Sequence, residues 1–297
     1  MKLFLVFSGL AVLCCTSAHA QTMNQREAAI QTFINDDSGR ITTVEKALTA
    51  TYAGWNGAPP SPPAPPTSSG RTLIFSTTHE TGSLSSWNFG RTAAYNSGSG
   101  KTWIAELSNA KSGRYALAQS VTADDSSGAR CFITADKDNK GIPHELYATT
   151  YLYLPTNFPW QKVGSWYNIQ QYKERQTVGA SSFVNPTLII NIGKDNNGAY
   201  LYIYNWIQGQ RTSYSQSGTK KYLPLGKWIK LEWYVKSSVS GGATWLKQDD
   251  VQIISRTGIK TISNDAYVLN WSVDNYAGSG PGATTIYWDD CTLEAPK

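Results

Sequence analysis

The amino-acid sequence predicts an all-β protein whose main part is a sandwich of two antiparallel sheets. From residue 71 onward, short runs of β-branched and aromatic residues alternate with turn signals such as Asp195-Asn196-Asn197-Gly198. No helical periodicity of useful length interrupts this pattern, and the composition is rich in Gly and Tyr and poor in Met. Because no internal repeat points to a propeller or a solenoid, a jelly roll is the expected topology.

The expected strands share β-branched or aromatic residues and are bounded by turn-forming residues. They are residues 72–76, 114–120, 129–134, 145–153, 166–172, 187–192, 199–206, 228–235, 242–246, 251–255 and 284–293. A single β-jelly-roll domain, residues 71–297, contains them all.

Residues 1–20 have the pattern of a secretory signal peptide. Lys2 supplies the positive start, an apolar stretch follows as far as Cys15, and Ala18-His19-Ala20 is a small-x-small cleavage site. We therefore expect a secreted protein, periplasmic or extracellular, after cleavage near Ala20. The apolar stretch is too short to cross a bilayer and no later segment is long enough, so no membrane span is expected.

Two further segments precede the β-domain. Residues 21–55 include a helical apolar spacing at Ala28, Ile30 and Phe33, which predicts a small helical segment. Residues 56–70 are rich in proline, a composition that favours an extended conformation and is typical of a semi-rigid linker.

Removal of the signal peptide leaves Cys131 and Cys291 of the four cysteines. In an oxidising compartment these two would form one disulfide closing a long loop, which is our slight preference. The alternative is two buried free thiols, because spacing in sequence does not fix the geometry that a disulfide needs. Two cysteines exclude a disulfide-dense mini-domain and a cysteine-rich zinc site.

The charge and the aromatic content indicate the class of partner. The formal net charge of +5 falls by one when Lys2 is removed, and the chain holds 11 Trp and 17 Tyr. A mildly basic, aromatic-rich secreted protein suggests a polysaccharide partner, which we expect to be anionic. No run of Lys and Arg and no nucleic-acid motif is present, so nucleic acid is not expected as a partner. We expect a monomer.

The expected strand at residues 166–172 and the residues directly after it are unusually polar. Side chains alternate between the two faces of a strand, so Gln171 and Lys173 share one face while Gln170 and Tyr172 share the other. Amides and cations flanked by tryptophan suit a sheet that binds sugars, which present hydroxyls at their edges and C–H groups on their faces. The alternative is an edge strand with a solvated face.

Four segments resemble a known family. Residues 79–87 are similar to the opening strand and loop of jelly-roll carbohydrate modules, and residues 145–155 to a lyase strand that ends in Leu-Pro. Residues 223–233 and 275–290 are similar to a long convex strand and the closing strands of the same lyases. The group is that of the heparin lyase I-like, concanavalin A-like jelly-roll polysaccharide lyases, and the resemblance covers residues 71–295. It implies a lyase that cleaves a uronate-containing polysaccharide by β-elimination. The alternative is a non-catalytic carbohydrate-binding module or a structural surface protein.

The resemblance also implies catalytic residues. Lyases of this superfamily commonly combine a Gln-x-His strand, an arginine strand and a late tyrosine. Gln171 and Lys173 occupy the first motif, with Lys in place of His, while Arg130 and Tyr276 match the other two. His144 is the remaining histidine that could approach a cleft, and a loop histidine without a role is the alternative.

The chemistry of β-elimination fits these residue types. A cation or amide must neutralise the uronate carboxylate, a base must remove the C5 proton, and an acid must protonate the leaving oxygen. Gln171, Asn191 or Arg130 would serve the first role, and Tyr276, Tyr172 or Lys173 the other two. Glycoside hydrolysis needs two paired carboxylates, and the acidic residues of the strands are scattered, so a hydrolase is the weaker expectation. The expected substrate-binding residues are polar or aromatic side chains on strands: Asn191, Tyr200, Tyr202, Tyr204, Trp206 and Arg175.

No cofactor is required by this chemistry, and calcium is the one metal that the sequence suggests. If the first and last strands pair, Glu80 would meet Asp289 or Asp290 and supply the hard oxygen ligands of a structural Ca²⁺. Ordinary surface acids are the alternative.

Overall fold

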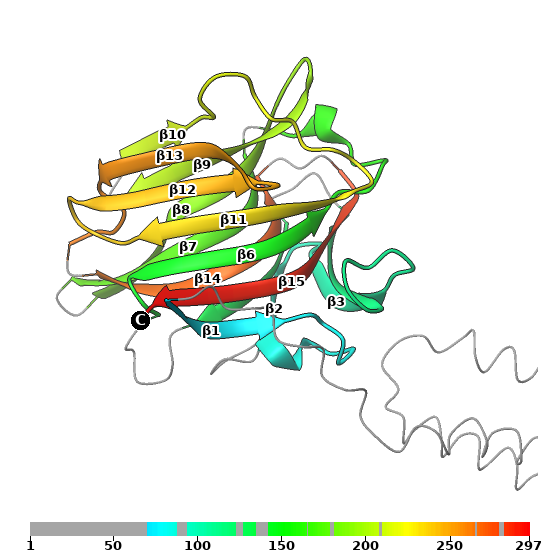
Figure 1. The fold of residues 1–297 in the computed structure, drawn as a ribbon, viewed down its shortest axis with the longest axis horizontal. Coiled ribbons are helices and arrows are strands. Elements are labelled where there is room, and N and C mark those ends of the chain that lie inside the picture. Colours follow the sequence, from blue (N-terminus) through cyan, green and yellow to red (C-terminus); the bar gives the residue numbers. More distant parts are fainter. Residues whose placement is uncertain are drawn as a thin grey trace, which may run out of the picture. The chain divides into compact units, whose positions relative to one another are not determined.

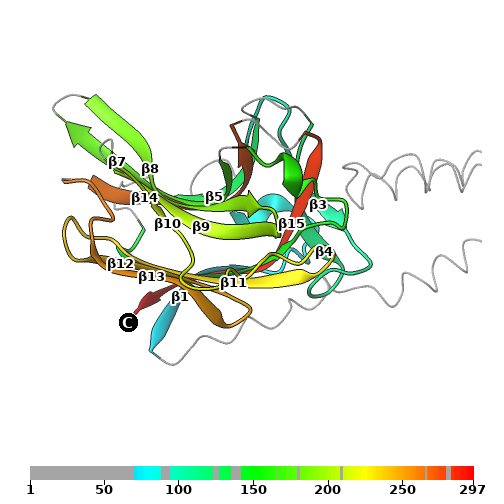
Figure 2. The same cartoon turned by 90° about the horizontal axis from the view of Figure 1, so that it is seen from above.

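Within the described residues, fifteen strands form two antiparallel sheets that lie one above the other as two layers (Figures 1 and 2). The computed structural model describes residues 70–87, 94–122, 127–134, 142–164, 166–178, 181–207, 210–264, 266–278 and 282–297. The expected signal peptide, the helical segment and the linker up to residue 69 lie outside these ranges. The expected all-β sandwich is confirmed.

Sheet A has the strand order β13-β12-β11-β6-β15-β4-β3, with β1 also paired to β15. Its strands are β1 (Arg71–Thr77), β3 (Lys101–Glu106), β4 (Tyr115–Val121), β6 (Glu145–Tyr153), β11 (Trp228–Lys236), β12 (Gly242–Gln248), β13 (Val251–Ile259) and β15 (Thr284–Pro296).

Sheet B has the strand order β10-β9-β8-β7-β14-β5-β2. Its strands are β2 (Ala94–Ser97), β5 (Gly128–Thr134), β7 (Tyr167–Val178), β8 (Ser181–Asp195), β9 (Gly198–Ile207), β10 (Gln210–Tyr214) and β14 (Ala266–Ala277). Two short 3₁₀ turns complete the elements, Leu84–Trp87 and Trp160–Lys162. Each expected strand coincides with an observed one, whereas β2, β3, β10 and β14 were not expected.

The core lies between the sheets and combines apolar packing with a few buried polar contacts. Strand β7 shows how the alternation works. Tyr172 points inward and its ring packs edge-to-face on Trp233 of sheet A, with 4.7 Å between centroids. Gln170 also points inward: its amide donates to Thr150 of sheet A at 2.8 Å and accepts from the indole of Trp271 at 3.2 Å. The intervening side chain, Gln171, must therefore point away from sheet A.

The expected disulfide is wrong. Cys131 and Cys291 are both free and buried, one on β5 of sheet B and the other on β15 of sheet A. The Cys291 thiol instead approaches the backbone carbonyl of Asp289 at 3.7 Å. Burial raises the pKa of both thiols well above the usual value, so both remain protonated.

A search for membrane spans over the described residues finds no helix with the length and apolar character to cross a bilayer.

Candidate functional site

Most of the expected site residues lie on the outward face of sheet B, the face turned away from sheet A. On β7 this face carries Gln171, Lys173 and Arg175, which alternate with the inward Gln170 and Tyr172. The same alternation applies to the other strands of the sheet, whose inward side chains belong to the buried core. The expected residues that share this face are Arg130, Gln171, Lys173, Arg175, Asn191, Tyr200, Tyr202, Tyr204, Trp206 and Tyr276.

The strand register orders these side chains into rows across the sheet. In one row, Tyr202 pairs with Asn191, Asn191 with Asn168, and Asn168 with Tyr276. Paired residues in an antiparallel sheet place their side chains on the same face with Cβ atoms about 5 Å apart. Four strands, β9, β8, β7 and β14, thus contribute one amide or phenol each to a continuous line.

A second row crosses the same strands: it lies two residues from the first on β9 and β8, three on β7 and four on β14, because the register shifts there. Gln171 occupies its middle and pairs with Ile189 on one side and Ser272 on the other. Ile189 continues to Tyr204, and Ser272 to Phe132. The row therefore runs from a phenol through an amide and a hydroxyl to a phenyl ring, so it offers both hydrogen-bonding and apolar contacts to a ligand.

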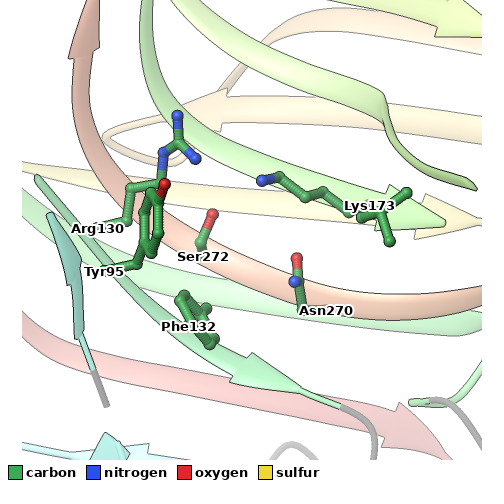
Figure 3. A pocket seen from close by; sticks show the side chains of 7 residues that line it. Tyr95, Arg130, Phe132, Lys173, Asn270 and Ser272 are labelled. Carbon is green, nitrogen blue, oxygen red and sulfur yellow. The ribbon is translucent and has the colours of Figure 1, made fainter. Parts of the chain in front are cut away.

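A pocket of about 310 Å³ opens on this face. Its lining residues come from β2, β5, β7, β8 and β14, and they are Tyr95, Arg130, Phe132, Lys173, Val184, Asn270 and Ser272. Figure 3 shows the Lys173 amine directed toward the Arg130 side chain, with the Ser272 hydroxyl between them. Two cations therefore share one small pocket.

Aromatic rings fix the position of Arg130. Its guanidinium lies 3.9 Å from the centroid of the Tyr276 ring and 5.7 Å from that of Tyr95, both within the range of a cation–π contact. The Tyr276 ring also packs on Trp166, with 4.9 Å between centroids. Gly128 lies opposite Tyr276, and a Cβ there would come within 2.5 Å of the ring, so only glycine fits.

Lys173 has an unusual charge state for a lysine. Burial, together with the nearby Arg130, lowers the pKa of its ammonium group to about 8, while Asp274 opposes the shift. An amine that titrates this close to neutral pH exists partly in its neutral form, so Lys173 is chemically able to accept a proton.

Asp274 is a site residue that the sequence reasoning missed. It pairs with Arg130 across β14 and β5 and is fully buried, and neither of its carboxylate oxygens has a hydrogen-bond partner of normal geometry within the described part of the chain. Burial raises the pKa of Asp274 to about 6, against the lowering effects of Arg130, Lys173 and the nearby Ser272 hydroxyl. The alternation of Trp271 and Val273 with polar residues was the signal that could have identified this strand.

A row of aromatic side chains extends the site along β9. Tyr200, Tyr202, Tyr204 and Trp206 point outward, and the indole of Trp206 is 38% exposed. The Lys220 ammonium lies 3.8 Å from the centroid of the Tyr200 ring. Burial raises the pKa of Tyr202 to about 12, with Tyr200 and Tyr204 acting in the same direction, so this phenol stays protonated at neutral pH.

Two of the candidate residues, Tyr172 and His144, do not lie on this face. Tyr172 points into the core, and burial raises its pKa well above that of a free phenol. His144 is exposed just before β6 of sheet A, where its carbonyl accepts the N–H of Ser237. Ile142, two residues before His144, forms a backbone hydrogen bond with β14, and the chain then runs toward sheet A. The structure therefore does not bring His144 to the pocket.

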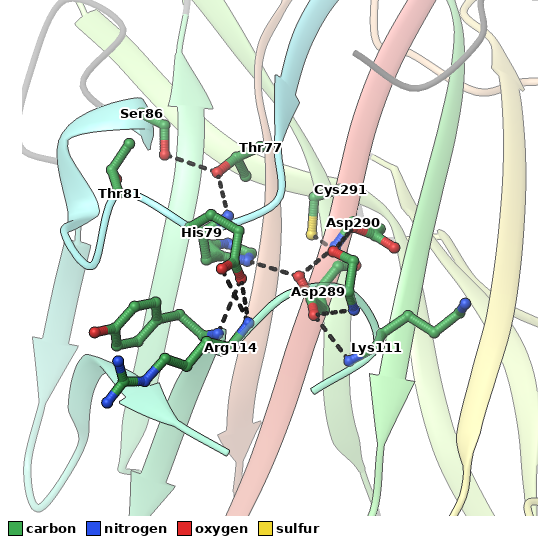
Figure 4. Close-up of polar contacts among 12 residues, drawn as sticks. Thr77, His79, Thr81, Ser86, Lys111, Arg114, Asp289, Asp290 and Cys291 are labelled. Atoms are coloured by element: carbon green, nitrogen blue, oxygen red, sulfur yellow. Dashed lines mark hydrogen bonds and ion pairs between the residues drawn. The ribbon is translucent and has the colours of Figure 1, made fainter. Parts of the chain in front are cut away.

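The expected calcium ligands are held by protein donors instead (Figure 4). The Glu80 carboxylate accepts the backbone N–H of Arg114 at 2.9 Å and that of Tyr115 at 2.9 Å. The Asp289 carboxylate accepts the N–H of Lys111 and of Ser112, at 3.0 and 3.2 Å, and Asp290 accepts the Ser112 hydroxyl at 2.6 Å.

These acids do not fit a calcium ion. In the part of the chain that the structure describes, no group of three or more His, Cys, Asp or Glu side chains is placed to hold a metal. His79 has a defined tautomer beside Asp289: its Nε2 accepts the indole N–H of Trp87 at 3.2 Å, so its Nδ1 carries the proton and faces Asp289 at 3.4 Å. The contacts of His79, Glu80, Asp289 and Asp290 therefore link residues near the start of the β-domain with residues near its end.

Comparison with known proteins supports the fold. No family model matches the sequence, and no curated protein matches it. Among solved structures, the chain is similar to an endo-β-1,4-glucuronan lyase from the fungus Trichoderma reesei, with 18% identity and a TM-score of 0.55 over 75% of this chain and 96% of that one. It is also similar to an alginate lyase from Chlorella virus, with 12% identity and a TM-score of 0.51 over 75% of this chain and 100% of that one. The chain has the fold of these polysaccharide lyases. The heparin lyase I-like group in particular stays a prediction.

Proposed function

We propose that the outward face of sheet B binds a uronate-containing polysaccharide and cleaves it by β-elimination. The observation that carries the proposal is the pairing of two cations in one pocket, Arg130 with a permanent charge and Lys173 with a pKa of about 8. One of these cations would bind the substrate carboxylate, and the other would take part in proton transfer. The fold shared with two polysaccharide lyases supports this choice over other reactions on sugars.

Each part of the reaction has a candidate group on this face. Arg130, with the amides of Gln171 and Asn191, would neutralise the carboxylate and so acidify the C5 proton. The neutral amine of Lys173 would take that proton, the C5–H electrons would form the C4–C5 double bond, and the C4–O bond would break. A phenol would give its proton to the leaving oxygen, either Tyr276, which contacts Arg130, or Tyr202, whose pKa of about 12 keeps it protonated.

Buried polar atoms that have no hydrogen-bond partner among the described residues gather on the same face. They are the Arg130 Nε, the Arg175 Nε, the Asn191 and Asn270 Oδ1, the Ser272 Oγ and both carboxylate oxygens of Asp274. Buried polar groups in proteins are nearly always hydrogen-bonded. Sugar hydroxyls and ring oxygens, which both donate and accept, are a class of ligand that would satisfy many of them at once.

A non-catalytic carbohydrate-binding role is the second candidate. The aromatic row of half-buried Tyr200, Tyr202 and Tyr204 and exposed Trp206 favours it, because outward-facing rings stack on the C–H faces of sugars without any need for proton transfer. Secretion, as expected from the first 20 residues, suits either role.

One screen separates the two roles. The protein without residues 1–20 is incubated with alginate, glucuronan, hyaluronan, heparin and pectin, and the ultraviolet absorbance of new unsaturated ends is followed. We expect a rise with at least one polymer, and its loss in Lys173→Gln. Lys230→Gln, which removes a lysine from sheet A, serves as the matched control and should behave like the wild type. Binding of a polymer without any rise in absorbance would favour the binding module.

A further inference from the structure

A buried carboxylate on β14, that of Asp274, lies opposite Arg130, one of the two cations of the pocket. Asp274 is 0% exposed, and among the described residues neither of its oxygens has a hydrogen-bond partner of normal geometry. Its strand register places it opposite Arg130, and its neighbours on the same face of β14, Ser272 and Asn270, line the pocket together with Lys173. A charge in this position is costly unless nearby cations offset it.

The groups around Asp274 come from four strands. Strand β5 contributes Arg130 on the outward face and the protonated Cys131 thiol on the inward one, and β7 contributes Lys173. Strand β14 itself carries Tyr276, whose ring holds the Arg130 guanidinium, and β2 adds Tyr95 on the other side of Arg130. Arg175 follows Lys173 on the same face of β7. Among these groups of the described residues, Asp274 is the only acid.

We propose that Asp274 is a positioning residue that keeps Lys173 charged up to weakly alkaline pH and holds Arg130 beside it. The proposal deepens the function proposed above, because it assigns the group that sets the charge of the expected base.

The physical reason is the repulsion between two cations in one pocket. Without a counter-charge, Lys173 would release its proton at a lower pH, because the neutral amine avoids the repulsion from Arg130. With Asp274 ionised, the trio of Arg130, Lys173 and Asp274 carries one net positive charge between pH values of about 6 and about 8, the pKa values of Asp274 and Lys173. This net positive charge would attract a uronate carboxylate while Lys173 is protonated, and loss of the Lys173 proton would then leave Arg130 to hold the carboxylate.

The direct test measures the titration of Lys173 without requiring turnover. Protein labelled with carbon-13 at the lysine Cε is titrated by NMR, and the Lys173 signal is identified as the one missing from Lys173→Arg. In Asp274→Asn we expect the Lys173 midpoint to fall by about one pH unit, the effect of removing one nearby opposite charge. A midpoint that stays in place or rises would overturn the proposal.

The reciprocal measurement uses the other partner and remains valid if Asp274→Asn does not fold. Coupling between two titrating groups is equal in both directions. Lys173→Met should therefore raise the midpoint of Asp274 above its value of about 6, read from the side-chain carboxyl carbon. An unchanged Asp274 midpoint would contradict the proposed coupling. The matched control is Asp250→Asn, which should shift Lys230, its partner at 2.8 Å in sheet A, and leave Lys173 unchanged.

If the screen finds a cleaved polymer, a second readout is available. The pH–rate profile of Asp274→Asn should shift toward acid by the same amount as the Lys173 titration. A uniform loss of rate with an unshifted profile would mean that Asp274 has only a structural role. If no polymer is cleaved, the proposed function fails, yet the two NMR titrations still decide whether Asp274 controls the charge of Lys173.

Discussion

The Arg130 guanidinium lies on the face of the Tyr276 ring, 3.9 Å from its centroid, and the two residues reach this contact from neighbouring strands of sheet B. The ring, and not the hydroxyl, makes this contact. The position of the cation and the proton of the phenol can therefore be changed separately, which allows the two roles of Tyr276 to be tested apart.

Tyr276→Phe should keep the fold and the position of Arg130 while lowering turnover by about 10² or more, the usual contribution of a proton-transfer group. We expect the loss at this residue because Arg130, which it contacts, would hold the substrate carboxylate. Turnover and thermal unfolding of the variant are compared with those of Tyr202→Phe. If Tyr202→Phe loses activity and Tyr276→Phe does not, the proton donor lies on β9 instead.

The rate of cleavage should rise with pH through the region of the Lys173 pKa, about 8. The sign follows from the role: the protonated amine below its pKa cannot accept the C5 proton, and the neutral amine above it can. Initial rates across a buffer series of constant ionic strength check the prediction. A rate that falls as the pH rises through 8 would show that Lys173 acts in its charged form.

Gly128→Ala should destabilise the domain by about 1–3 kcal/mol, the typical cost of forcing an extra carbon into a packed site. The new Cβ would meet the Tyr276 ring at 2.5 Å and displace it from Arg130. Thermal or urea unfolding measures the effect. Gly241→Ala is the control, since its Cβ would meet only the Ser238 hydroxyl at 3.8 Å. The free energy of unfolding should therefore fall more in Gly128→Ala than in Gly241→Ala, and an equal loss would contradict the prediction.

Calcium and chelators should leave the melting temperature unchanged. The Asp289 carboxylate already accepts backbone N–H groups of Lys111 and Ser112, and Glu80 those of Arg114 and Tyr115. Asp289→Ala should lower stability by about 1–3 kcal/mol or more, because it leaves buried donors unpaired. Calorimetry with calcium and with a chelator is the measurement, and stabilisation by calcium would restore the metal site as a candidate.

Cys131 and Cys291 should resist thiol reagents in the folded protein and react only when it unfolds. Both thiols are buried, and burial keeps their pKa values well above the usual range, so little thiolate is present to react. The reaction of the protein without residues 1–20 with a chromogenic disulfide is followed with and without denaturant. Fast reaction of either thiol under native conditions would show local opening of the core.

The sequence alone was sufficient to predict the sandwich fold and the side chains that share the outward face of sheet B. It was insufficient to predict the charged groups of that face. Alternation alone correctly assigned Gln171 and Lys173 to one face and Gln170 and Tyr172 to the other, because a period of two is a local property of a strand. Asp274 was missed because its strand contains polar residues at both parities, such as Asn275, which accepts the buried hydroxyl of Tyr167 at 2.6 Å. The disulfide could not be decided from the sequence either, because spacing along the chain does not fix the distance and orientation that two thiols need to form a bond.

The inward contacts of β7 separate the attachment of this strand from its outward face. Gln170 and Tyr172 attach this strand to sheet A through Thr150 and Trp233. The side chains at residues 171, 173 and 175 point away from these contacts. A substitution there would change the outward face of sheet B while the attachment of β7 to sheet A stays in place.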